Sequence, residues 1–331
     1  MQVKDIGEQG LLRILQKFCP AEIVGDDCAV MATNPNQSLA ITTDMLVDGV
    51  HFSDRTTGPY YAGWRAAAAN LSDLAAMGAT PLAVTVALAV AADTAVEWVE
   101  EFYRGMTACL QEYDTPIVGG DVVRSPVVTV AITAFGQVEC DRTISRSNAR
   151  SGWAIVATGV HGASRAGLEL LLNPEFGQNL EKVDRASLIL AHQRPKPRLD
   201  VLPVVWEILD YAGEFSIAGM DSSDGLADAI IQICRASCVG AKIDRTKLPI
   251  PDIFSEIVSP EQALDWALYG GEDFELVLFL PIANAQLLVE KIGNAAAIVG
   301  TATDSTDIWL TDSSGIYPDI VLKLDRGFQH F

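Results

Sequence analysis

The sequence predicts a mixed α/β (α+β) protein with two domains. Its 331 residues exceed the usual length of one domain, and hydrophobic residues make up 49% of them, which is enough for two cores. Short apolar segments typical of strands are interleaved with segments of helical period. Polar residues dominate 139–152 and mark a boundary. We therefore expect an N-terminal domain at 1–140 and a C-terminal domain at 150–331.

The N-terminal domain is predicted to combine strands with two long helices. The Ala-rich segment 60–77 ends at Gly78 and Pro81, which is a helix stop signal. Segment 94–113 places Trp98, Phe102, Met106 and Leu110 at helical spacing. The predicted elements in chain order are strand 39–43, which ends in a Thr-Thr-Asp turn, helix 60–77, strand 82–90, helix 94–113, and strands 116–120 and 127–138.

The C-terminal domain is predicted to begin with a strand and to alternate afterwards. An apolar stretch at 216–220 leads into the sequence DSSDGL, after which a helix follows. Each half thus places an Asp cluster after a strand, which hints at two related units. The predicted elements are strand 153–158, helices near 163–172, 183–193, 199–211 and 226–238, and strands 274–280, 296–301 and 307–310.

Composition excludes several classes of partner. The 43 acidic residues outnumber the 23 Lys and Arg, which gives a net charge of −20 and disfavours nucleic acid and anionic membranes. The N-terminal segment carries internal charges unlike a signal peptide, and the longest apolar run, 81–92, is too short to span a bilayer. The six Cys lack CxxC spacing. Cys234 and Cys238 are interpreted as core residues, with metal ligands as the alternative. We expect a cytoplasmic protein.

Four Asp-bearing segments lie at strand-to-helix junctions or beside Gly, Ser and Thr. Converging carboxylates repel one another unless a cation joins them. Oxygen ligands without paired Cys and His favour magnesium or calcium over zinc. A divalent ion would also let so acidic a protein bind a phosphorylated substrate. The segments are GDDCA at 25–29, TTDMLVDGVHF at 42–52, NLSDLAAMGATP at 70–81 and DSSDGLADA at 221–229, with Gly-Gly-acid turns at 119–121 and 270–273.

Familiar nucleotide and hydrolase motifs are missing from the sequence. It has no P-loop, no His-Arg-Asp or Asp-Phe-Gly of protein kinases, no G-x-G-x-x-G, no G-x-S-x-G and no His-Glu-x-x-His. DSSDGLADA differs from an EF-hand, because Gly225 is its fifth residue rather than its sixth and Gln232 stands where the bidentate Glu belongs.

The acidic segments, together with TISRSNARSG and GGEDFEL, occur in an order and spacing that resembles the thiamine-monophosphate kinase family. This family lies in the superfamily of aminoimidazole ribonucleotide synthetase and selenophosphate synthetase. The resemblance covers essentially the whole chain. It implies an N-terminal ATP- and metal-binding sheet domain that pairs with its twin in a homodimer, and a mixed α/β C-terminal domain. It also implies direct transfer of the ATP γ-phosphoryl group to thiamine monophosphate, which gives thiamine diphosphate.

The resemblance assigns metal ligands for several Mg²⁺ ions. Asp44 and Asp73 are the expected central residues, bridging ions between donor and acceptor phosphates, and the threonines are expected to act through hydroxyl or backbone oxygen. Any single Asp could instead cap a helix or stabilise a turn. Asp73 fits that alternative poorly, because an uncompensated carboxylate is costly on an apolar helix. The matched positions are Asp27, Thr42, Thr43, Asp44, Asp73, Asp121, Asp221 and Asp224.

The resemblance also assigns substrate contacts. The ATP contacts are Tyr103, Gly120, Asp121, Arg146 and Ser223. Thiamine monophosphate would meet His51, Glu272 and Phe328, since a carboxylate and an aromatic face suit a cationic thiazolium ring. Phe328 replaces the Trp or Tyr of some relatives. Each of these residues could also have a role without substrate. Tyr103 and Phe328 could pack in the core, Arg146 could be an ordinary surface residue, and His51 could be a structural histidine.

Other functions stay open at this point. A noncatalytic divalent-ion or nucleotide sensor would keep the metal residues without turnover. A selenophosphate synthetase should carry a reactive N-terminal Cys beside a Lys, a setting that Cys19 lacks. A hydrogenase-maturation relative should end in a Cys-bearing tail, whereas this sequence ends in Gln-His-Phe. Strands 82–90 and 127–138 would leave a sheet edge for a second subunit, so we expect a homodimer with an apolar interface.

Overall fold

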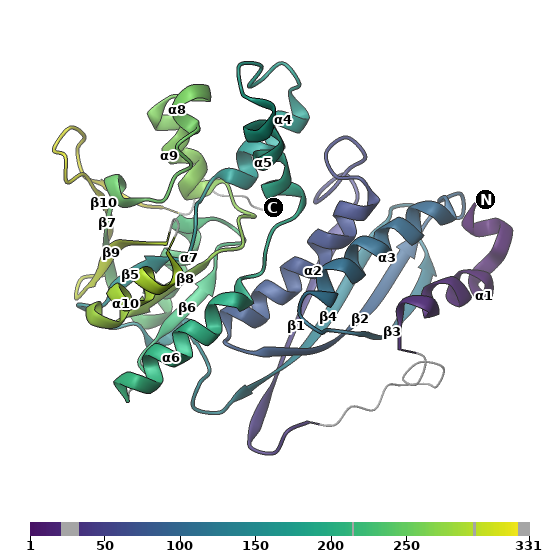
Figure 1. Ribbon diagram of the computed structural model, residues 1–331, viewed down its shortest axis with the longest axis horizontal. Coiled ribbons are helices and arrows are strands. Elements are labelled where there is room, and N and C mark those ends of the chain that lie inside the picture. The colour runs from purple at the N-terminus through teal and green to yellow at the C-terminus, as the bar shows by residue number, and fades with distance from the viewer. Residues whose placement is uncertain (21–32, 214, 294–295, 324–331) are drawn as a thin grey trace. The chain divides into compact units, whose positions relative to one another are not determined.

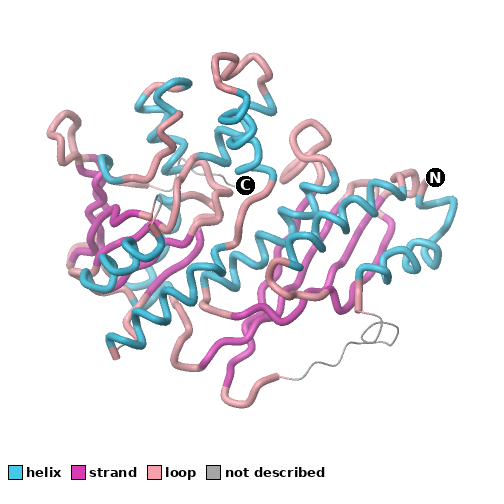
Figure 2. The backbone as a smooth tube through the Cα atoms, in the orientation of Figure 1, coloured by secondary structure: helices cyan, strands magenta, loops and turns pink. Residues whose placement is uncertain are grey.

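The structure is a computed structural model that describes residues 1–20, 33–213, 215–293 and 296–323 (Figure 1). The chain divides into two compact units. Unit 1 comprises Met1–Leu74 and Ala79–Cys140, and unit 2 comprises Ala75–Gly78 and Asp141–Phe331. Each unit contains helices and one β-sheet (Figure 2), so the predicted α/β (α+β) class is confirmed. In the described part of the chain, no helix has both the length and the apolarity needed to cross a membrane.

Unit 1 is built on a four-stranded sheet of order β1-β4-β2-β3. Strand β4 pairs antiparallel with β1 on one side and with β2 on the other, whereas β2 and β3 are parallel. The Thr-Thr-Asp segment lies in the middle of β1 and Gly119-Gly120-Asp121 lies inside β3, so the turns predicted at both places are wrong. The strands are β1 Gln37–Val47, β2 Thr80–Val90, β3 Ile117–Arg124 and β4 Thr129–Glu139.

Helices α2 (Pro59–Ala76) and α3 (Val96–Gln111) cover one face of this sheet (Figure 1). They approach closely because two glycines lie at the crossing. A Cβ on Gly63 would lie 1.9 Å from the carbonyl oxygen of Phe102, and one on Gly105 would lie 1.7 Å from that of Tyr60. Only hydrogen fits at either position, so the sequence sets the distance between the helices.

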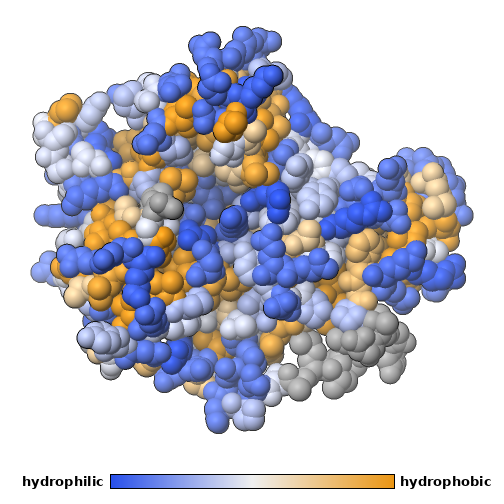
Figure 3. Space-filling view, in the orientation of Figure 1, coloured by the Kyte–Doolittle hydropathy of each residue, from blue (hydrophilic) through white to orange (hydrophobic). Residues whose placement is uncertain are grey.

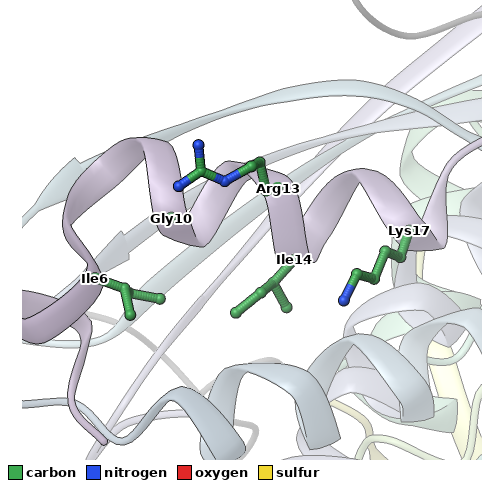
Figure 4. A pocket seen from close by; sticks show the side chains of 5 residues that line it. All are labelled: Ile6, Gly10, Arg13, Ile14 and Lys17. Carbon is green, nitrogen blue, oxygen red and sulfur yellow. The ribbon is translucent and has the colours of Figure 1, made fainter.

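Helix α1 (Val3–Leu15) continues into a 3₁₀ turn, Gln16–Phe18, and contacts α3. Its apolar side chains Ile6 and Ile14 point away from the side on which Arg13 projects (Figure 4). The helix is interrupted between these two residues at Gly7, whose φ of +63° and ψ of −179° are not helical. Both side chains line a pocket with Gly10, Arg13 and Lys17.

The second face of the unit 1 sheet is left open by the helices and is apolar along β1. Leu39, Ile41 and Met45 alternate along this strand and are 50%, 59% and 56% exposed. The intervening residues point to the helix-covered face, because successive side chains of a strand alternate. Strand β1 therefore presents Leu39, Ile41 and Met45, with Thr43 among them, on its open side, and Thr42, Asp44 and the buried Leu46 toward the helices.

Unit 2 contains a seven-stranded mixed sheet of order β11-β10-β7-β9-β5-β8-β6. The central strands β5 and β8 are buried along their whole length, which is typical of strands covered on both faces. The strands are β5 Ala154–Ala157, β6 Ala218–Asp221, β7 Gly240–Asp244, β8 Leu276–Leu280, β9 Ala297–Thr303, β10 Ile308–Thr311 and β11 Ile320–Val321.

Helices cover both faces of this sheet. On strand β8, Val277 and Phe279 join a core with α7 (Leu226–Ser237), whereas Leu276 and Leu278 join a core with α6 (Leu202–Ala212) and α10 (Ile282–Ile292). A third cluster gathers α4, α5, α8 and α9. These are Ala163–Leu172, Lys182–Gln193, Phe254–Ile257 and Pro260–Tyr269. The remaining 3₁₀ turns are η2 Arg146–Asn148, η3 Arg198–Val201 and η4 Arg245–Lys247.

Hydrophilic residues dominate the face of the molecule shown in Figure 3, and hydrophobic residues are confined to patches between them. This distribution agrees with a net charge of −20, which is carried at the surface because ionised side chains are expensive to bury.

Candidate active site

The first cluster of predicted residues lies in unit 1, where strand β1 meets helix α2. The hydroxyl of Thr42 donates a hydrogen bond to a carboxylate oxygen of Asp73. The backbone N–H of Asp44 donates to the side-chain oxygen of Asn70 at 3.2 Å. Asn70 and Asp73 are three residues apart and therefore share one side of α2. The structure thus brings Thr42, Asp44 and Asp73 to the helix-covered face of the sheet.

Asn70 was not among the predicted site residues. It is fully buried, and its amide nitrogen donates to the carbonyl of Ala66 at 3.0 Å while its oxygen accepts from Asp44. The amide nitrogen thus fixes the side chain to its own helix, and the amide oxygen joins the helix to the strand. The available signal was its place three residues before Asp73 in the same acidic segment.

Thr43 and Asp121 lie on the opposite face of the same sheet. Asp44 shares a cross-strand row with Ile132, Val86 and Gly120, whereas Asp121 shares the row of Ala87, Ala131 and Met45. The hydroxyl of Thr43 donates to the carbonyl of Ile132 at 2.8 Å. The side chains of Thr43 and Asp121 are therefore separated from those of Thr42, Asp44 and Asp73 by the thickness of one strand.

The other predicted residues of unit 1 have varied surroundings. Tyr103 is buried on α3 between Phe18 and Phe102, with ring centroids at 5.5 and 6.1 Å, and burial raises the pKa of its hydroxyl. Gly120 packs against the carbonyl of Val86: a Cβ added to Gly120 would lie 2.1 Å from that oxygen. His51 accepts a hydrogen bond at Nδ1 from the backbone N–H of Val47 at 3.0 Å, which fixes the turn after β1.

A second cluster lies in unit 2, where β6 ends and α7 begins. Asp221 is the last residue of β6 and is buried, and its carboxylate accepts a hydrogen bond from the hydroxyl of Ser223 at 3.3 Å. Gly225, with φ of +108°, turns the chain into α7. Asp224 is exposed just before the free N–H groups of that helix. Such a helix start attracts phosphate, because its N–H groups and dipole favour negative charge.

Arg146 lies within electrostatic range of this helix start. Burial raises the pKa of Asp228 in the first turn of α7, and the charge of Asp224 raises it further, whereas Arg146 lowers it. Arg146 is exposed, and its carbonyl accepts a hydrogen bond from the hydroxyl of Ser237 at 2.7 Å. Unit 2 therefore holds an available guanidinium near the loop of Asp221, Ser223 and Asp224.

The turn that carries Glu272 is joined to the same loop by its backbone. The N–H of Glu272 donates to the carbonyl of Ser223 at 2.7 Å, and the N–H of Ser222 donates to the carbonyl of Glu275 at 2.8 Å. Glu272 has φ of +60°. Its side chain is 35% exposed, so the carboxylate is reachable from solvent.

Two buried residues beside this loop were missed by the sequence reasoning. His161 is fully buried, with Nε2 3.1 Å from the hydroxyl of Ser222 and Nδ1 3.0 Å from the carbonyl of Gly159. Burial lowers the pKa of His161 to about 4. A neutral ring that donates through Nδ1 and accepts through Nε2 satisfies both contacts. Ser222 is itself buried, so this Ser-His pair supports the loop and is closed to a substrate.

The donors in both clusters suit a hard cation. They are carboxylate and hydroxyl oxygens, the ligand type that Mg²⁺ and Ca²⁺ prefer. Within the described ranges, no group of three or more His, Cys, Asp and Glu side chains has a geometry that would hold a metal ion. The residue set predicted for metal is divided between units 1 and 2, and Asp27 and Phe328 lie outside the described residues.

Comparison with known proteins gives consistent results. Residues 25–138 match the family described as AIR synthase related protein, N-terminal domain. A thiamine-monophosphate kinase of Synechococcus elongatus is 49% identical over 329 residues, which cover 99% of this chain and 98% of that protein. The thiamine-monophosphate kinase of Escherichia coli K12 is 40% identical over 271 residues, or 82% of this chain and 80% of that protein.

Solved structures agree with these relatives. Thiamine-monophosphate kinase from Stenotrophomonas maltophilia superimposes with a TM-score of 0.76 at 31% identity and covers 86% of this chain and 88% of its own. AaThiL complexed with AMPPCP and TMP gives a TM-score of 0.71 at 29% identity, with 97% and 98% covered. The hydrogenase maturation protein HypE in complex with ATP, at 19% identity and a TM-score of 0.72 over 98% and 99%, shows the shared fold alone.

Proposed function

The chain belongs to the thiamine-monophosphate kinase family, and from this premise we propose that it transfers the γ-phosphoryl group of ATP to thiamine monophosphate in a magnesium-dependent reaction that gives thiamine diphosphate. The observation that carries the proposal is the 49% identity over nearly the full length of a relative of that name. A related structure described with AMPPCP and TMP supports a nucleotide and a thiamine phosphate as the two substrates.

The chemistry of this reaction makes charge the main difficulty. Donor and acceptor are both phosphates, so several negative charges must approach one another in a protein that is itself strongly acidic. We assign Asp44 and Asp73 as the principal magnesium ligands, with Thr42, Asp221, Asp224 and Asp27 as further ligands. The side chains of Thr43 and Asp121 lie on the other face of the sheet and would have to serve a separate ion. Bound magnesium would neutralise the phosphate oxygens during transfer.

In unit 1 the carboxylate of Asp73 and the backbone of Asp44 are held in place. The hydroxyl of Thr42 orients the carboxylate of Asp73, and Asn70 fixes the backbone of Asp44. Because strand and helix are themselves packed in the core, the carboxylates need not be ordered when substrates bind. Such preorganisation supplies a large part of the rate enhancement in phosphoryl transfer.

The residues of unit 2 receive the phosphates and the acceptor ring. We assign Ser223 and Arg146 to the ATP phosphates, since a guanidinium binds phosphate through two parallel hydrogen bonds. Tyr103, Gly120 and Asp121 are the further ATP contacts of unit 1. Glu272 is assigned to the cationic thiazolium ring, with His51 and Phe328 as the other contacts of thiamine monophosphate.

The transfer is proposed to be direct and in line. A covalent phosphoenzyme needs an accessible nucleophile beside a base. Ser222 has a base beside it, but both Ser222 and His161 are buried. Trapping a stoichiometric phosphorylated residue on the productive pathway would contradict direct transfer.

The test of the function uses the purified full chain with ATP, magnesium and thiamine monophosphate, and it measures thiamine diphosphate by chromatography. We expect product with magnesium and none with excess chelator. Free thiamine is the control acceptor and should react little, because it lacks the acceptor phosphate. Phosphorylation of free thiamine but not of its monophosphate would overturn the assignment, and binding of both substrates without turnover would identify a sensor.

We also propose that the protein is a homodimer joined through unit 1. The support is the open apolar face of the sheet, where Leu39, Ile41 and Met45 are 50–59% exposed. Apolar side chains gathered on one face commonly mark an interface. The mass in solution tests this proposal, because one chain is 35.5 kDa.

A further inference from the structure

The turn that carries Glu272 has an unusual backbone. Gly271, Glu272 and Phe274 have φ values of +65°, +60° and +53°. Glycine adopts such angles freely, but Glu and Phe rarely do, because their Cβ atoms crowd the backbone. Residues in this region persist only when their surroundings hold them there, and they gather at functional sites.

Asp273 joins the turn to the start of helix α4. Its two carboxylate oxygens accept hydrogen bonds from the backbone N–H of Gly162 at 2.6 Å and of Ser164 at 2.9 Å. These N–H groups stand at the start of the ten-residue helix α4, where they have no acceptor within the helix. Asp273 therefore anchors the strained turn to the end of a helix in the same unit.

His192 approaches the side chain of Glu272 from another helix. His192 lies at the end of α5 and is buried. Its Nδ1 is 3.2 Å from the hydroxyl of Ser164 and 3.7 Å from a carboxylate oxygen of Glu272. Ser164 thus contacts Asp273 through its backbone and His192 through its side chain. The four residues form one connected polar cluster, in which the side chain of Glu272 is 35% exposed.

We propose that Asp273 and His192 are positioning residues that hold the carboxylate of Glu272 in one orientation for the cationic ring of the acceptor substrate. Asp273 sets the backbone and His192 sets the side chain. A free glutamate must lose rotamer freedom when it pairs with a ligand, and a carboxylate held in advance avoids that cost. This inference rests on the proposed function, since it gives Glu272 its substrate.

A double-mutant cycle tests the role of His192. We expect His192→Phe, which keeps a ring and removes both nitrogens, to raise the KM for thiamine monophosphate about tenfold and to leave the KM for ATP within about twofold. In a Glu272→Gln background the same change should have no further effect on either constant, because His192 acts only through Glu272. Additive effects in the cycle, or equal increases in both KM values, would overturn the proposal.

Asp273→Asn gives the second variant. Asn replaces one acceptor oxygen with an amide that faces the N–H of Gly162 or Ser164, so one of the two hydrogen bonds is lost. Leu188→Ala is the matched control: Leu188 is buried one turn before His192 on α5 and belongs to the apolar cluster of α4 and α5. Leu188→Ala should lower the melting temperature without a selective change in the KM for thiamine monophosphate.

A substrate-free measurement separates this proposal from the proposed function. Hydrogen exchange of the backbone amides of 270–275 should be faster in Asp273→Asn than in Leu188→Ala at equal loss of global stability. If exchange is faster but the wild-type protein binds no thiamine monophosphate, the assigned substrate is wrong and the positioning of the turn stands. If exchange is unchanged in Asp273→Asn, the positioning role is refuted whatever the substrate.

Discussion

The hydroxyl of Thr42 on β1 donates a hydrogen bond to the carboxylate of Asp73 on α2, 31 positions further along the chain. A second link runs from the backbone of Asp44 to Asn70. Two acidic residues from separate motifs are thus held by one strand and one helix that pack together in unit 1. Their spacing is set by the fold and needs no substrate to form.

This relationship predicts the effect of neutralising either carboxylate. Asp44→Asn and Asp73→Asn keep the side-chain size but remove one negative charge each. If the two residues hold magnesium, initial rates should fall at least about a hundredfold, roughly 2.7 kcal/mol of transition-state stabilisation. The fold should persist or gain stability, since repulsion between carboxylates is relieved.

The control for that pair is Asp93→Asn, an exposed carboxylate of the same unit, which should leave the rate unchanged. Thermal melts with and without magnesium and ATP complete the experiment. If Asp73 were only a structural acceptor, Asp73→Asn would melt at a lower temperature with nearly normal specific activity. Normal rates in both variants would exclude the proposed metal site.

The glycines at the crossing of α2 and α3 predict a packing defect. Alanine at Gly63 or Gly105 gains up to about 1 kcal/mol of helix propensity. The added methyl, however, would overlap a backbone carbonyl of the facing helix, which cannot rotate away. Overpacking costs about 1–3 kcal/mol or more, so each variant should be less stable in urea unfolding. Gly58→Ala, which meets no atom within 4 Å, is the control and should change stability by less than about 0.5 kcal/mol.

His161 predicts a loss of stability in acid. Burial lowers its pKa from the ordinary 6.5 to about 4. As pH falls through this window the unfolded chain binds a proton that the folded chain does not, so the stability contributed above pH 6.5 is lost, up to about 3 kcal/mol. The stability of the wild type relative to His161→Gln should therefore shrink between pH 6.5 and 4. A difference that is constant over this range would show that His161 does not titrate as described.

For Asp273 we expect the opposite dependence of stability on pH over nearly the same pH range. Burial raises its pKa to about 7, against the two backbone N–H groups that lower it. The folded chain then keeps a proton that the unfolded chain releases, so this contribution is full below the ordinary value of 3.8 and is lost as pH rises to about 7. The free energy of unfolding of Asp273→Asn and of the wild type, measured by denaturation at several pH values, gives this contribution. If the stability of the wild type relative to the variant grew with pH, the prediction would be contradicted.

The open face of the unit 1 sheet predicts a change in mass. Ile41→Lys places a charge in the apolar row of β1 and should convert the proposed dimer to a monomer of about 35.5 kDa in light scattering. Tyr211→Lys is the control, because Tyr211 is 91% exposed but lies on α6 of unit 2. A wild-type monomer, or a dimer that survives Ile41→Lys unchanged, would contradict the proposed interface.

Local patterns predicted most of the regular elements. Helix α4 has the predicted bounds 163–172, and α5 and α7 differ from theirs by one residue at one end, because amphipathic period and Gly endings are local signals. Strand β7 was missed: it is five residues long with an exposed Lys242 in the middle. Helix α9 was missed although Ser259 caps its first turn and Pro260 follows, a start signal that was available.

The grouping of the candidate residues was predictable where they share a motif. Asp221, Ser223 and Asp224 lie together in one loop as their spacing implies. Residues that join motifs could not be found, since Asn70, His161 and His192 meet their partners only through tertiary packing. The side chains of Thr42 and Thr43 point to opposite faces because the Thr-Thr-Asp segment is a strand, and the sequence had been interpreted there as a turn.

Strand β1 leaves few positions free to vary. Leu39, Ile41 and Met45 form the apolar row, and Thr42, Thr43 and Asp44 between them belong to the candidate site. In a typical surface strand every second position tolerates most substitutions. In a saturation screen for growth without external thiamine diphosphate, this segment should show no such alternation.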